Sequence, residues 1–503
     1  MSEQLFFPDA ARFQELAAHH HMVPVATEIV ADLDTPLTLF AKFTEDYDDK
    51  FLFESMEGGE KWGRYSFIGC DPLVSLTSKG EIITITEYGA AEKSVGFSGK
   101  PLTALRHLQA ELGAASLPEL PRFCGGLVGY LGYDLVRSLE DLPDDRPPAP
   151  GADAAFMAPR LLLAHDSLRQ KATLICWSRL KTHNPDEAAA AYADACARLK
   201  RIIARLKSPL PTRLREEGKK PLPRPDFEPN MRPAAFAAMV ERAKEYILSG
   251  DIIQVVLSQR FHLQAATAIP PMRLYRALRR INPSPYLFFL QLGQLMQIGS
   301  SPEILVRLTG DEIELRPIAG TRKRGGNEAE DLALERELLA DPKERAEHVM
   351  LVDLGRNDVG RIAQGGSVTV RDLMVVERYS HVMHLVSDVR GRLAAGKDQF
   401  DVVAACFPAG TVSGAPKIRA MQIIDELEPQ RRGPYAGAVG YFGFSGAMDF
   451  CITIRTMVIQ KDELSIQAGA GIVADSNPER EYQETINKSM ALRRAVELAC
   501  EGF

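Results

Sequence analysis

The feature that most limits how this chain can fold is a proline-rich stretch near its middle. From Pro209 to Pro233 there are seven prolines, with several charged residues and one glycine. Proline lacks a backbone N–H group and has a fixed φ, so this stretch can form neither a helix nor an internal strand. We therefore predict a linker over residues 208–232, between an N-terminal domain of residues 1–207 and a C-terminal domain of residues 233–503.

The size and composition of the chain indicate a globular protein of two or three domains. It has 503 residues, of which 45% are hydrophobic and 25% charged, and its formal net charge is −7. Without a long basic stripe, an acidic chain is a poor partner for nucleic acid, whose phosphates need clustered Lys and Arg. The seven cysteines are scattered and form no Cys-x-x-Cys pair, which favours reduced thiols over a disulfide framework or a zinc site.

The N-terminus does not resemble a secretion signal, because Glu3 and Asp9 interrupt the apolar run that such a signal needs. The longest apolar stretch, from Ala436 to Met448, is rich in glycine and too short to cross a bilayer. We therefore expect a cytoplasmic protein with no membrane partner.

Local patterns predict both strands and helices. Residues 73–86 have β-branched segments on either side of a glycine turn, which predicts a β-hairpin. Asn184 and Pro185 are typical of a helix start. A further helix is expected over residues 233–249, ended by Gly250. These patterns establish mixed α and β content but not topology.

The strongest chemical signal is two pairs of glutamates, each on one face of a predicted helix. Asp341 is the expected N-cap of the first helix, in which Glu344 and Glu347 are three residues apart. Glu481 and Glu484 have the same spacing in a helix near the C-terminus. Carboxylate oxygens suit a hard cation such as Mg²⁺, so two such helices could converge on one ion.

Each pair also has a simpler interpretation. Glu344 occupies a capping-box position, where its carboxylate could bond only the backbone amide of Asp341. Glu484 could form an i,i+4 ion pair with Lys488 on a solvated face. Leu492 continues that face as an apolar residue, which argues against full solvation. The residues alone leave both interpretations open.

Twelve ordered blocks of sequence carry a family resemblance. They are GRYSFIG (63–69), GGLVGY (125–130), GDIIQVVLSQR (250–260), NPSPY (282–286), GSSPE (299–303), RPIAGTR (316–322), AEH (346–348), DLGRND (353–358), ERYS (377–380), MH (383–384), FPAGTVSGAPK (407–417) and QAGAGIV (467–473). With these blocks, which are densest over residues 233–495, the chain resembles the chorismate-utilising enzymes and, within them, the large subunits of anthranilate synthases.

The resemblance implies an α+β fold in which antiparallel β-sheets pack together with helices outside. It also implies that Glu347 and Glu484 contact Mg²⁺ directly, with Glu344 and Glu481 nearby through water. The ion would bridge this acidic pocket and the ring carboxylate of chorismate.

The resemblance further implies a set of substrate contacts. Arg455, on an expected strand over residues 452–455, offers a planar fork to the enolpyruvyl carboxylate. Backbone amides of a glycine-rich segment can approach the same carboxylate closely. The implied substrate-binding residues other than Arg455 are Gly320 and Thr321 at the ring-carboxylate end, Thr411 and Tyr435 at the pyruvyl end, and Gly469, Ala470, Gly471 and Lys488.

Two residues are implied to transfer protons. Glu303 resembles the general acid that protonates the departing C4 hydroxyl while ammonia attacks C2, a role worth roughly 10²–10⁴-fold in rate. His384 matches the position associated with loss of the C2 proton and of pyruvate, and an imidazole suits proton abstraction near neutral pH. A lone histidine is more often a hydrogen-bonded core residue, and for His384 that alternative stays open.

Two positions distinguish the reaction within the family. Relatives that add water to chorismate carry a lysine base where this chain has Gln254, and a neutral amide cannot deprotonate water. Aminodeoxychorismate synthases often carry a lysine in a PIKGT segment where this chain has Ala319. Both differences favour a lyase that makes anthranilate for tryptophan biosynthesis. The rival interpretations are a relative that makes aminodeoxychorismate or stops at the aminated intermediate, and a catalytically silent, tryptophan-sensing protein.

The resemblance also implies partners. No Gly-x-Cys-x-Gly nucleophile segment of a glutaminase follows the last expected helix. We therefore expect ammonia to come from a separate glutamine amidotransferase small subunit, in a heterotetramer of two large and two small subunits.

Feedback inhibition by L-tryptophan is implied as well. The family binds tryptophan near an LLES segment, which here reads LFES over residues 52–55, and near NPSPY. The implied contacts are Ser55, Pro285, Tyr286 and Leu287. The larger ring of Phe53 could crowd the pocket. The alternative is that residues 52–55 form only a buried strand.

Overall fold

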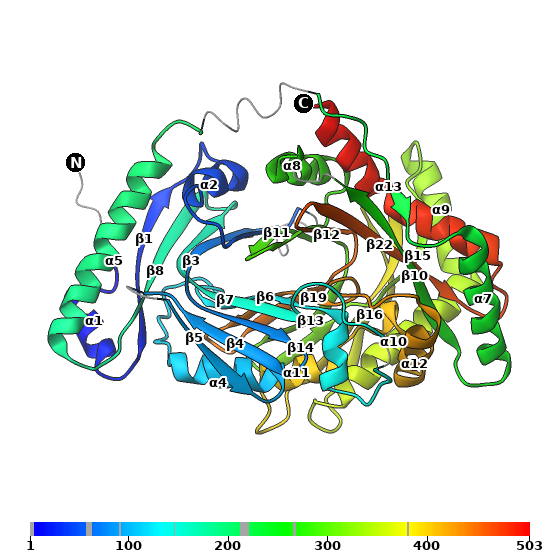
Figure 1. Ribbon diagram of the computed structural model, residues 1–503, viewed down its shortest axis with the longest axis horizontal. Helices are drawn as coiled ribbons and strands as arrows, with labels where there is room; N and C mark the ends of the chain where they lie inside the picture. Colours follow the sequence, from blue (N-terminus) through cyan, green and yellow to red (C-terminus); the bar gives the residue numbers. More distant parts are fainter. Residues whose placement is uncertain are drawn as a thin grey trace.

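Two long, bent strands organise the molecule. The computed structural model describes residues 5–56, 63–89, 92–144, 146–211, 221–264, 268–379 and 382–502. In it, β3 (Tyr65–Lys79) pairs with β7 (Ala154–Asp166) along almost its whole length, with a register shift between Pro72 and Val74. Different strands pair with the two halves of β3 and β7 on either side of this shift. The β3–β7 ladder therefore belongs to two layers at once (Figure 1).

The first layer extends from the Tyr65 end of this ladder. Its remaining strands, in the order of pairing, are β1 (Met22–Val30), β8 (Lys171–Arg179), then beyond the ladder β2 (Lys50–Glu54), β11 (Tyr286–Leu292), β12 (Leu295–Ser301), β21 (Thr456–Gln460), β22 (Glu463–Ile472) and β10 (Gln254–Gln264), with the two-residue strands β9 (Glu228–Pro229) and β18 (Gly414–Ala415) at the β10 edge.

The second layer extends from the other end of the ladder. Its strands are β5 (Lys93–Ser98) and β4 (Ile82–Glu87) on one side, and on the other β6 (Gly126–Leu131), β19 (Ala438–Gly443), β20 (Met448–Ile452), β13 (Ile304–Thr309), β14 (Glu312–Leu315), β15 (Ile318–Lys323), β17 (Val382–Arg392) and β16 (Thr369–Arg378). All these strand pairs are antiparallel, which confirms the predicted fold class.

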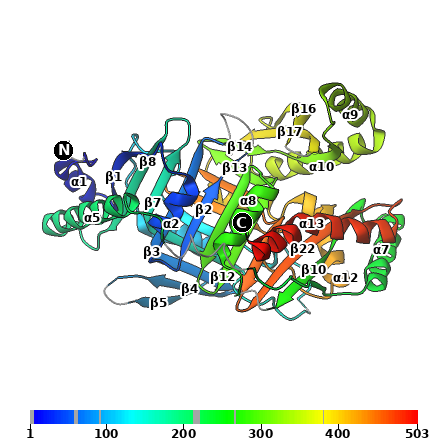
Figure 2. The same ribbon diagram turned by 90° about the horizontal axis from the view of Figure 1, so that it is seen from above.

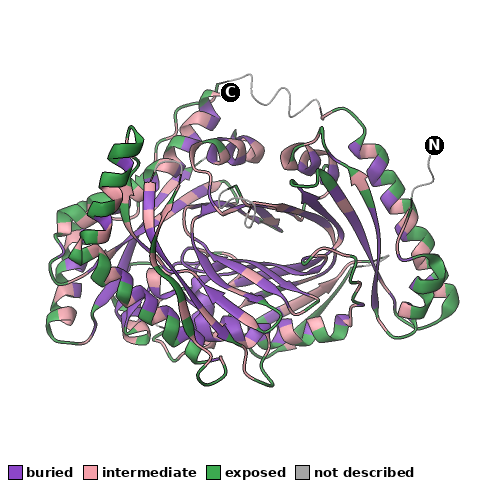
Figure 3. Ribbon diagram, turned by 180° about the vertical axis from the view of Figure 1, so that it is seen from behind, coloured by how far each residue is buried: buried purple, intermediate pink, exposed green. Residues whose placement is uncertain are grey.

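Helices cover the outer faces of both layers. They are α1 (Ala10–Ala17), α2 (Pro36–Phe43), α4 (Pro101–Leu112), α5 (Pro185–Leu206), α7 (Pro233–Leu248), α8 (Pro271–Ile281), α9 (Glu328–Ala340), α10 (Pro342–Gly360), α11 (Gln399–Cys406), α12 (Lys417–Leu427) and α13 (Pro478–Glu501), with the short 3₁₀ helices η1 (Tyr133–Ser138) and η3 (Gly410–Val412). Most strand residues are buried, while the outer helix faces are exposed (Figure 3). Among residues 5–502, apart from the undescribed gaps, no helix is long and apolar enough to cross a membrane.

The local predictions are confirmed. The hairpin over residues 73–86 is the β3–β4 pair, with Gly80 in its turn at φ +57°. The side chain of Asn184 accepts a hydrogen bond from the backbone of α5 and caps it. Gly250 follows α7 at φ +83°, the left-handed conformation expected of a residue that ends a helix.

Strands from the two ends of the chain interleave. The N-terminal strand β2 pairs with β11, and β6 pairs with β19. Part of the linker predicted over residues 208–232 lies outside the described residues. Its described part contains β9, which pairs only with the edge of β10 near Phe261, as expected of a proline-containing segment. The predicted domain boundaries stay a prediction.

Close packing of strands around Gly129 gives a test of this architecture. A Cβ atom on Gly129 would lie 1.9 Å from the carbonyl oxygen of Ala155 in β7. We expect Gly129→Val to lower the free energy of unfolding by about 3 kcal/mol, because backbone cannot move aside as a flexible side chain can. Urea unfolding measures this loss. The matched control is Gly96→Val in exposed β5, where a Cβ meets nothing within 4 Å and the change should stay within about 0.5 kcal/mol; equal losses would contradict the packing described.

Candidate active site

Glu303 is a buried carboxyl group between β12 and β13. Its side chain is 8% exposed, and its backbone carbonyl accepts a hydrogen bond from the Ile452 amide at 3.0 Å. Burial raises the pKa of Glu303 to about 7, against the opposing effects of the Thr411 hydroxyl and the Lys488 ammonium group. A carboxyl group that keeps its proton near neutral pH can serve as an acid.

His384 lies on β17, beside β15. Its Nδ1 is 2.9 Å from the carbonyl oxygen of Gly320 and 3.1 Å from the hydroxyl of Thr321. A carbonyl can only accept, so Nδ1 carries the hydrogen and Nε2 keeps the lone pair. Burial and the nearby Arg455 guanidinium lower the pKa of His384, although the Gly320 carbonyl opposes them. The ring is therefore in the neutral form that a base requires.

Gly320 connects His384 to the acidic residues. It has φ +68° and lies at a register shift between β15 and β17. A Cβ atom there would be 3.2 Å from Glu344 Oε2. Glycine tolerates both this left-handed conformation and the close approach of the carboxylate.

The first glutamate pair begins α10 as predicted. The Asp341 side chain accepts hydrogen bonds from the backbone amides of Lys343 and Glu344, so it caps the helix. The backbone amide of Asp341 donates to Leu338, while the carboxylate of Glu344 accepts from Arg322 at 3.2 Å. The interpretation of Glu344 as only a capping residue is therefore wrong.

The two acidic helices approach each other. Burial raises the pKa of Glu347, and the neighbouring carboxylates Glu344 and Glu484 raise it further, while Lys488 opposes them. The pKa of Glu481 is raised in the same way by burial and by Glu484. Helix α13 thus carries its pair to the pair on α10, which the sequence could not establish.

The surroundings of these carboxylates suit a metal ion in some respects and not in others. They are oxygen donors of the type that Mg²⁺ prefers, and their mutual repulsion is only partly offset by cations. Lys488 also forms the ion pair with Glu484, at 2.7 Å, that a solvated face would show. Over the described ranges, no three His, Cys, Asp or Glu side chains are close enough to share one ion. The donor type fits, and the metal ion stays a prediction.

Arg455 does not lie on a strand, and that expectation is wrong. It follows β20 and precedes β21 in a tight connection, with a left-handed φ of +51°. Its Nη1 donates to the carbonyl oxygen of Lys488 at 2.6 Å, and burial lowers the pKa of Arg455. The connection places the guanidinium against α13, close enough to His384 to affect its pKa.

The predicted glycine-rich segment forms one wall of the site. On β22, a Cβ on Gly469 would be 2.8 Å from the Tyr435 hydroxyl, and one on Gly471 would be 2.5 Å from Gln254 Nε2. Lys488 Nζ donates to the Gly469 carbonyl at 3.0 Å. Ala470 lies between the two glycines and is fully buried. Tyr435, Gln254 and Lys488 therefore each lie against this wall, and its binding of substrate stays a prediction.

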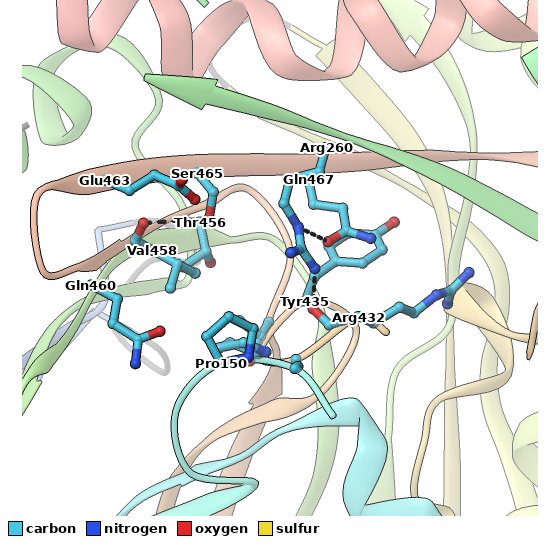
Figure 4. Close-up of a pocket in the computed structure, with 14 residues that line it drawn as sticks. Pro150, Arg260, Arg432, Tyr435, Thr456, Val458, Gln460, Glu463, Ser465 and Gln467 are labelled. Carbon is cyan, nitrogen blue, oxygen red and sulfur yellow. Dashed lines mark hydrogen bonds between the residues drawn. The ribbon is translucent and has the colours of Figure 1, made fainter. Parts of the chain in front are cut away.

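Sequence reasoning missed the residues behind Tyr435. A pocket beside it is lined by Arg260, Arg432, Thr453 and Gln467, among others, and Figure 4 shows Arg260, Gln467 and Tyr435 together at one end of it. Arg432 is 2% exposed. Arg432 directly follows another arginine in the sequence, and such pairs are usually solvated. No sequence signal therefore marked Arg432 as buried.

The two segments predicted to bind tryptophan lie side by side. Residues of β2 pair with β11 so that Glu54 is opposite Leu287, and the Met56 amide donates to the Ser284 carbonyl at 3.1 Å. The LFES segment is indeed a strand as far as Glu54, and Ser55 follows it. Tyr286, next to Pro285, donates from its hydroxyl to Asp449 at 3.0 Å. The four predicted contacts therefore share one region.

Comparisons with known proteins agree with this geometry. A family model of chorismate binding enzymes matches residues 51–494. The anthranilate synthase component 1 of Acetivibrio thermocellus is 46% identical over 504 residues, which cover 99% of this chain and 100% of that protein. The Aquifex aeolicus protein of the same name is 47% identical and covers 97% of each.

Solved structures show the same fold. Anthranilate synthase component I from Streptococcus pneumoniae TIGR4 superposes with a TM-score of 0.74 at 37% identity, covering 87% of this chain and 95% of that chain. The Escherichia coli isochorismate synthase MenF superposes with a TM-score of 0.70 at 22% identity, a likeness of fold alone.

The fold and the site thus define an enzyme that acts on chorismate: the chain belongs to the chorismate binding enzyme family. Within that family, it belongs with the anthranilate synthase component 1 proteins that it matches over nearly their whole length.

The raised pKa of Glu303 predicts that Glu303→Gln stabilises the fold, and that this gain in stability depends on pH. Because the folded-state pKa is about 7 rather than 4.5, ionised Glu303 destabilises the fold, and this penalty grows as pH rises through that interval. Between pH 5 and pH 8 we expect Glu303→Gln to become more stable relative to the parent chain by up to about 3 kcal/mol. Urea unfolding at both pH values measures it. Glu479→Gln, at an exposed position, should show no such trend; a pH-independent difference for Glu303→Gln would contradict the assignment.

Proposed function

We propose that this chain aminates chorismate with ammonia and eliminates pyruvate, giving anthranilate for tryptophan biosynthesis. The observation that carries the choice of nucleophile is the Gln254 amide, which lies against Gly471 in the wall of the site. An amide cannot remove a proton from water, so ammonia, which needs no such activation, is the favoured nucleophile. The names of the relatives at 46–47% identity support the same reaction.

Glu303 would act in the first step. The nitrogen lone pair of ammonia forms a bond to C2, the ring double bonds shift, and the C4–O bond breaks. The proton of Glu303 leaves with the hydroxyl group as water, and the new ammonium group then loses a proton. The pKa of about 7 supports this role, because a carboxyl group with its ordinary pKa would already have lost its proton.

His384 would act in the second step. Its Nε2 removes the proton from C2, and the electron pair makes the ring aromatic as the bond to the enolpyruvyl oxygen breaks. The departing enolpyruvate takes up a proton and becomes pyruvate. The hydrogen bond from Nδ1 to the Gly320 carbonyl supports this role, since it holds the tautomer whose lone pair is on Nε2.

The remaining implied residues would hold the substrate at its two ends. Arg455 and the amides of Gly469–Gly471 would bind the enolpyruvyl carboxylate, with Tyr435 and Thr411 beside it. Gly320 and Thr321 would lie toward the ring carboxylate, and Lys488 would bind beside Gly469, to whose carbonyl it donates. The approach of Tyr435 to Gly469, and the separate contact of His384 with Gly320 and Thr321, support this division.

We further propose that Glu347 and Glu484 hold Mg²⁺, with Glu344 and Glu481 nearby. When bound, the ion supplies a positive charge that attracts the ring carboxylate and offsets developing negative charge. Support comes from the effect of Glu344 and Glu484 on Glu347, and of Glu484 on Glu481, whose pKa values are raised by these neighbouring carboxylates as well as by burial. Lys488 would have to give up its ion pair with Glu484 when the ion binds.

Ammonia would come from a glutamine amidotransferase small subunit. The name component 1, carried by the relatives, supports a partner component. A heterotetramer of two large and two small subunits is the assembly that we propose. Size-exclusion chromatography of the two co-expressed subunits would establish the stoichiometry.

The purified chain should convert chorismate to anthranilate with ammonium salt and Mg²⁺ at alkaline pH, where free ammonia is available. Anthranilate fluorescence measures the product, and EDTA should abolish it. Chorismate left unconsumed by a folded preparation would contradict the proposal. Consumption without fluorescence would indicate aminodeoxychorismate, which mass spectrometry identifies.

Feedback inhibition is proposed from the pairing of β2 with β11, which brings Ser55 beside the Pro285–Leu287 segment. We expect tryptophan to inhibit the reaction and Ser55→Ala to raise its inhibition constant about tenfold, because a hydrogen bond to a charged ligand contributes roughly 1.5 kcal/mol. Dose–response curves with ammonium as substrate measure it. A Ser55→Ala enzyme that remains fully sensitive would show that this contact is wrongly assigned.

A further inference from the structure

Arg432 is a buried cation that forms hydrogen bonds with three segments of the chain. Its Nε and Nη2 donate to the Glu428 carboxylate at 2.9 and 2.6 Å, its Nη1 donates to the Val412 carbonyl at 2.7 Å, and its Nη2 also donates to the Val256 carbonyl at 2.7 Å. An arginine that is 2% exposed costs several kcal/mol to desolvate unless it is paired in this way. Its position is therefore fixed by geometry, since few arrangements satisfy so many partners.

The two backbone carbonyl partners, of Val412 and Val256, each adjoin a residue of the candidate site. Val412 follows Thr411 in η3. Val256 is opposite Gly471 in the β10–β22 pair, next to the glycine wall. The Arg432 guanidinium also lies 5.5 Å from the ring centroid of Tyr435. One side chain thus ties together Thr411, Tyr435 and the wall formed by Gly469–Gly471, none of which are neighbours in sequence.

The N-terminal part of the chain supports Arg432 as well. The ring of Tyr133 lies 4.7 Å from the guanidinium, and the Tyr133 amide donates to the Gly433 carbonyl at 2.7 Å. The Gly433 amide in turn donates to the Asp134 carboxylate at 2.9 Å. Residues 133–134 therefore hold the turn after Arg432, where Gly433 has φ +62° and the chain leads on to Tyr435.

We propose that Arg432 is a positioning residue for the pyruvyl end of the substrate site. It holds Tyr435 and Thr411 at a set distance from the glycine wall without touching the substrate. The proposal rests on the assignment of these residues to the substrate in the proposed function. Misplacing contact groups by about 1 Å can cost roughly a hundredfold in rate. The planar arrangement of hydrogen bonds that Arg432 donates therefore matters more than its positive charge.

The variant Arg432→Lys separates the contribution of the hydrogen-bond arrangement from that of the positive charge. Lysine keeps the charge beside Glu428 but cannot reach both the Val412 and Val256 carbonyls with a planar fork. We expect the variant to fold, by circular dichroism, with kcat/KM for chorismate reduced about 10–100-fold. The KM should rise, because both displaced groups bind the ground state. The pH profile should not move, since Arg432 is not among the groups that affect the pKa of Glu303.

The matched control is Arg64→Lys, which makes the same change in a contact of three hydrogen bonds with Asp166, at the end of the β3–β7 ladder. It should leave kcat and KM within about twofold of the parent. A folded Arg432→Lys enzyme with unchanged constants, or with a loss explained by its unfolded fraction alone, would overturn the positioning role.

If Arg432→Lys does not fold, Tyr133→Leu tests the same role by removing the ring on the other side of the guanidinium. We expect KM to rise about threefold, in line with a cation–π contact of roughly 0.7 kcal/mol, and an unchanged KM would overturn the proposal. Titration calorimetry with chorismate in the absence of ammonium measures binding directly. A parent chain that binds chorismate but forms no anthranilate would count against the proposed reaction alone, and weaker binding by the variant would still support positioning.

Discussion

The structure depends most on the continuous pairing of β3 with β7. Because both strands pass through the register shift at Pro72 and Val74 and continue to pair on either side of it, they join the two layers by backbone hydrogen bonds. The strands that follow add to each layer from both ends of the sequence, so residues around position 54 lie beside residues around 287. The view from above shows the helices α8 and α13 over one layer and α10 beside the other (Figure 2). The candidate site forms where these parts meet.

Electrostatics within the site follow from burial and from uneven pairing of charges. The carboxyl group of Glu303 has lost water, and the Thr411 hydroxyl and the Lys488 ammonium group offset this loss only in part, so its pKa moves toward neutrality. Arg432 has also lost water but has gained a carboxylate and two carbonyls, so it stays charged and fixed. Glu347 lies between these two cases, because the like charges of neighbouring carboxylates raise its pKa while Lys488 lowers it. One site thus contains a buried carboxyl group with a raised pKa, a buried cation with a full set of partners, and acidic side chains whose repulsion is only partly offset.

Much of the local structure could be predicted because it depends on neighbours in sequence. Asn184 and Asp341 cap their helices through backbone amides two or three residues away, and Gly80 turns a hairpin between adjacent strands. The expectation for Arg455 failed because apolar, β-branched residues favour a strand, whereas the chain makes a left-handed turn there to place the guanidinium against α13. Propensity does not record that long-range contact.

The sequence by itself determined which chemical groups are present: the glutamate pairs, the acid at Glu303, the histidine, and a glutamine where a lysine would direct other chemistry. Short-range spacing also placed the glutamate pairs on their helices. Only the tertiary structure decided which groups meet, that α10 and α13 converge and that Arg432 is buried behind Tyr435. The physical reason is that these meetings depend on the pairing of strands far apart in sequence and on desolvation, and neither is encoded in the spacing of residues along one segment.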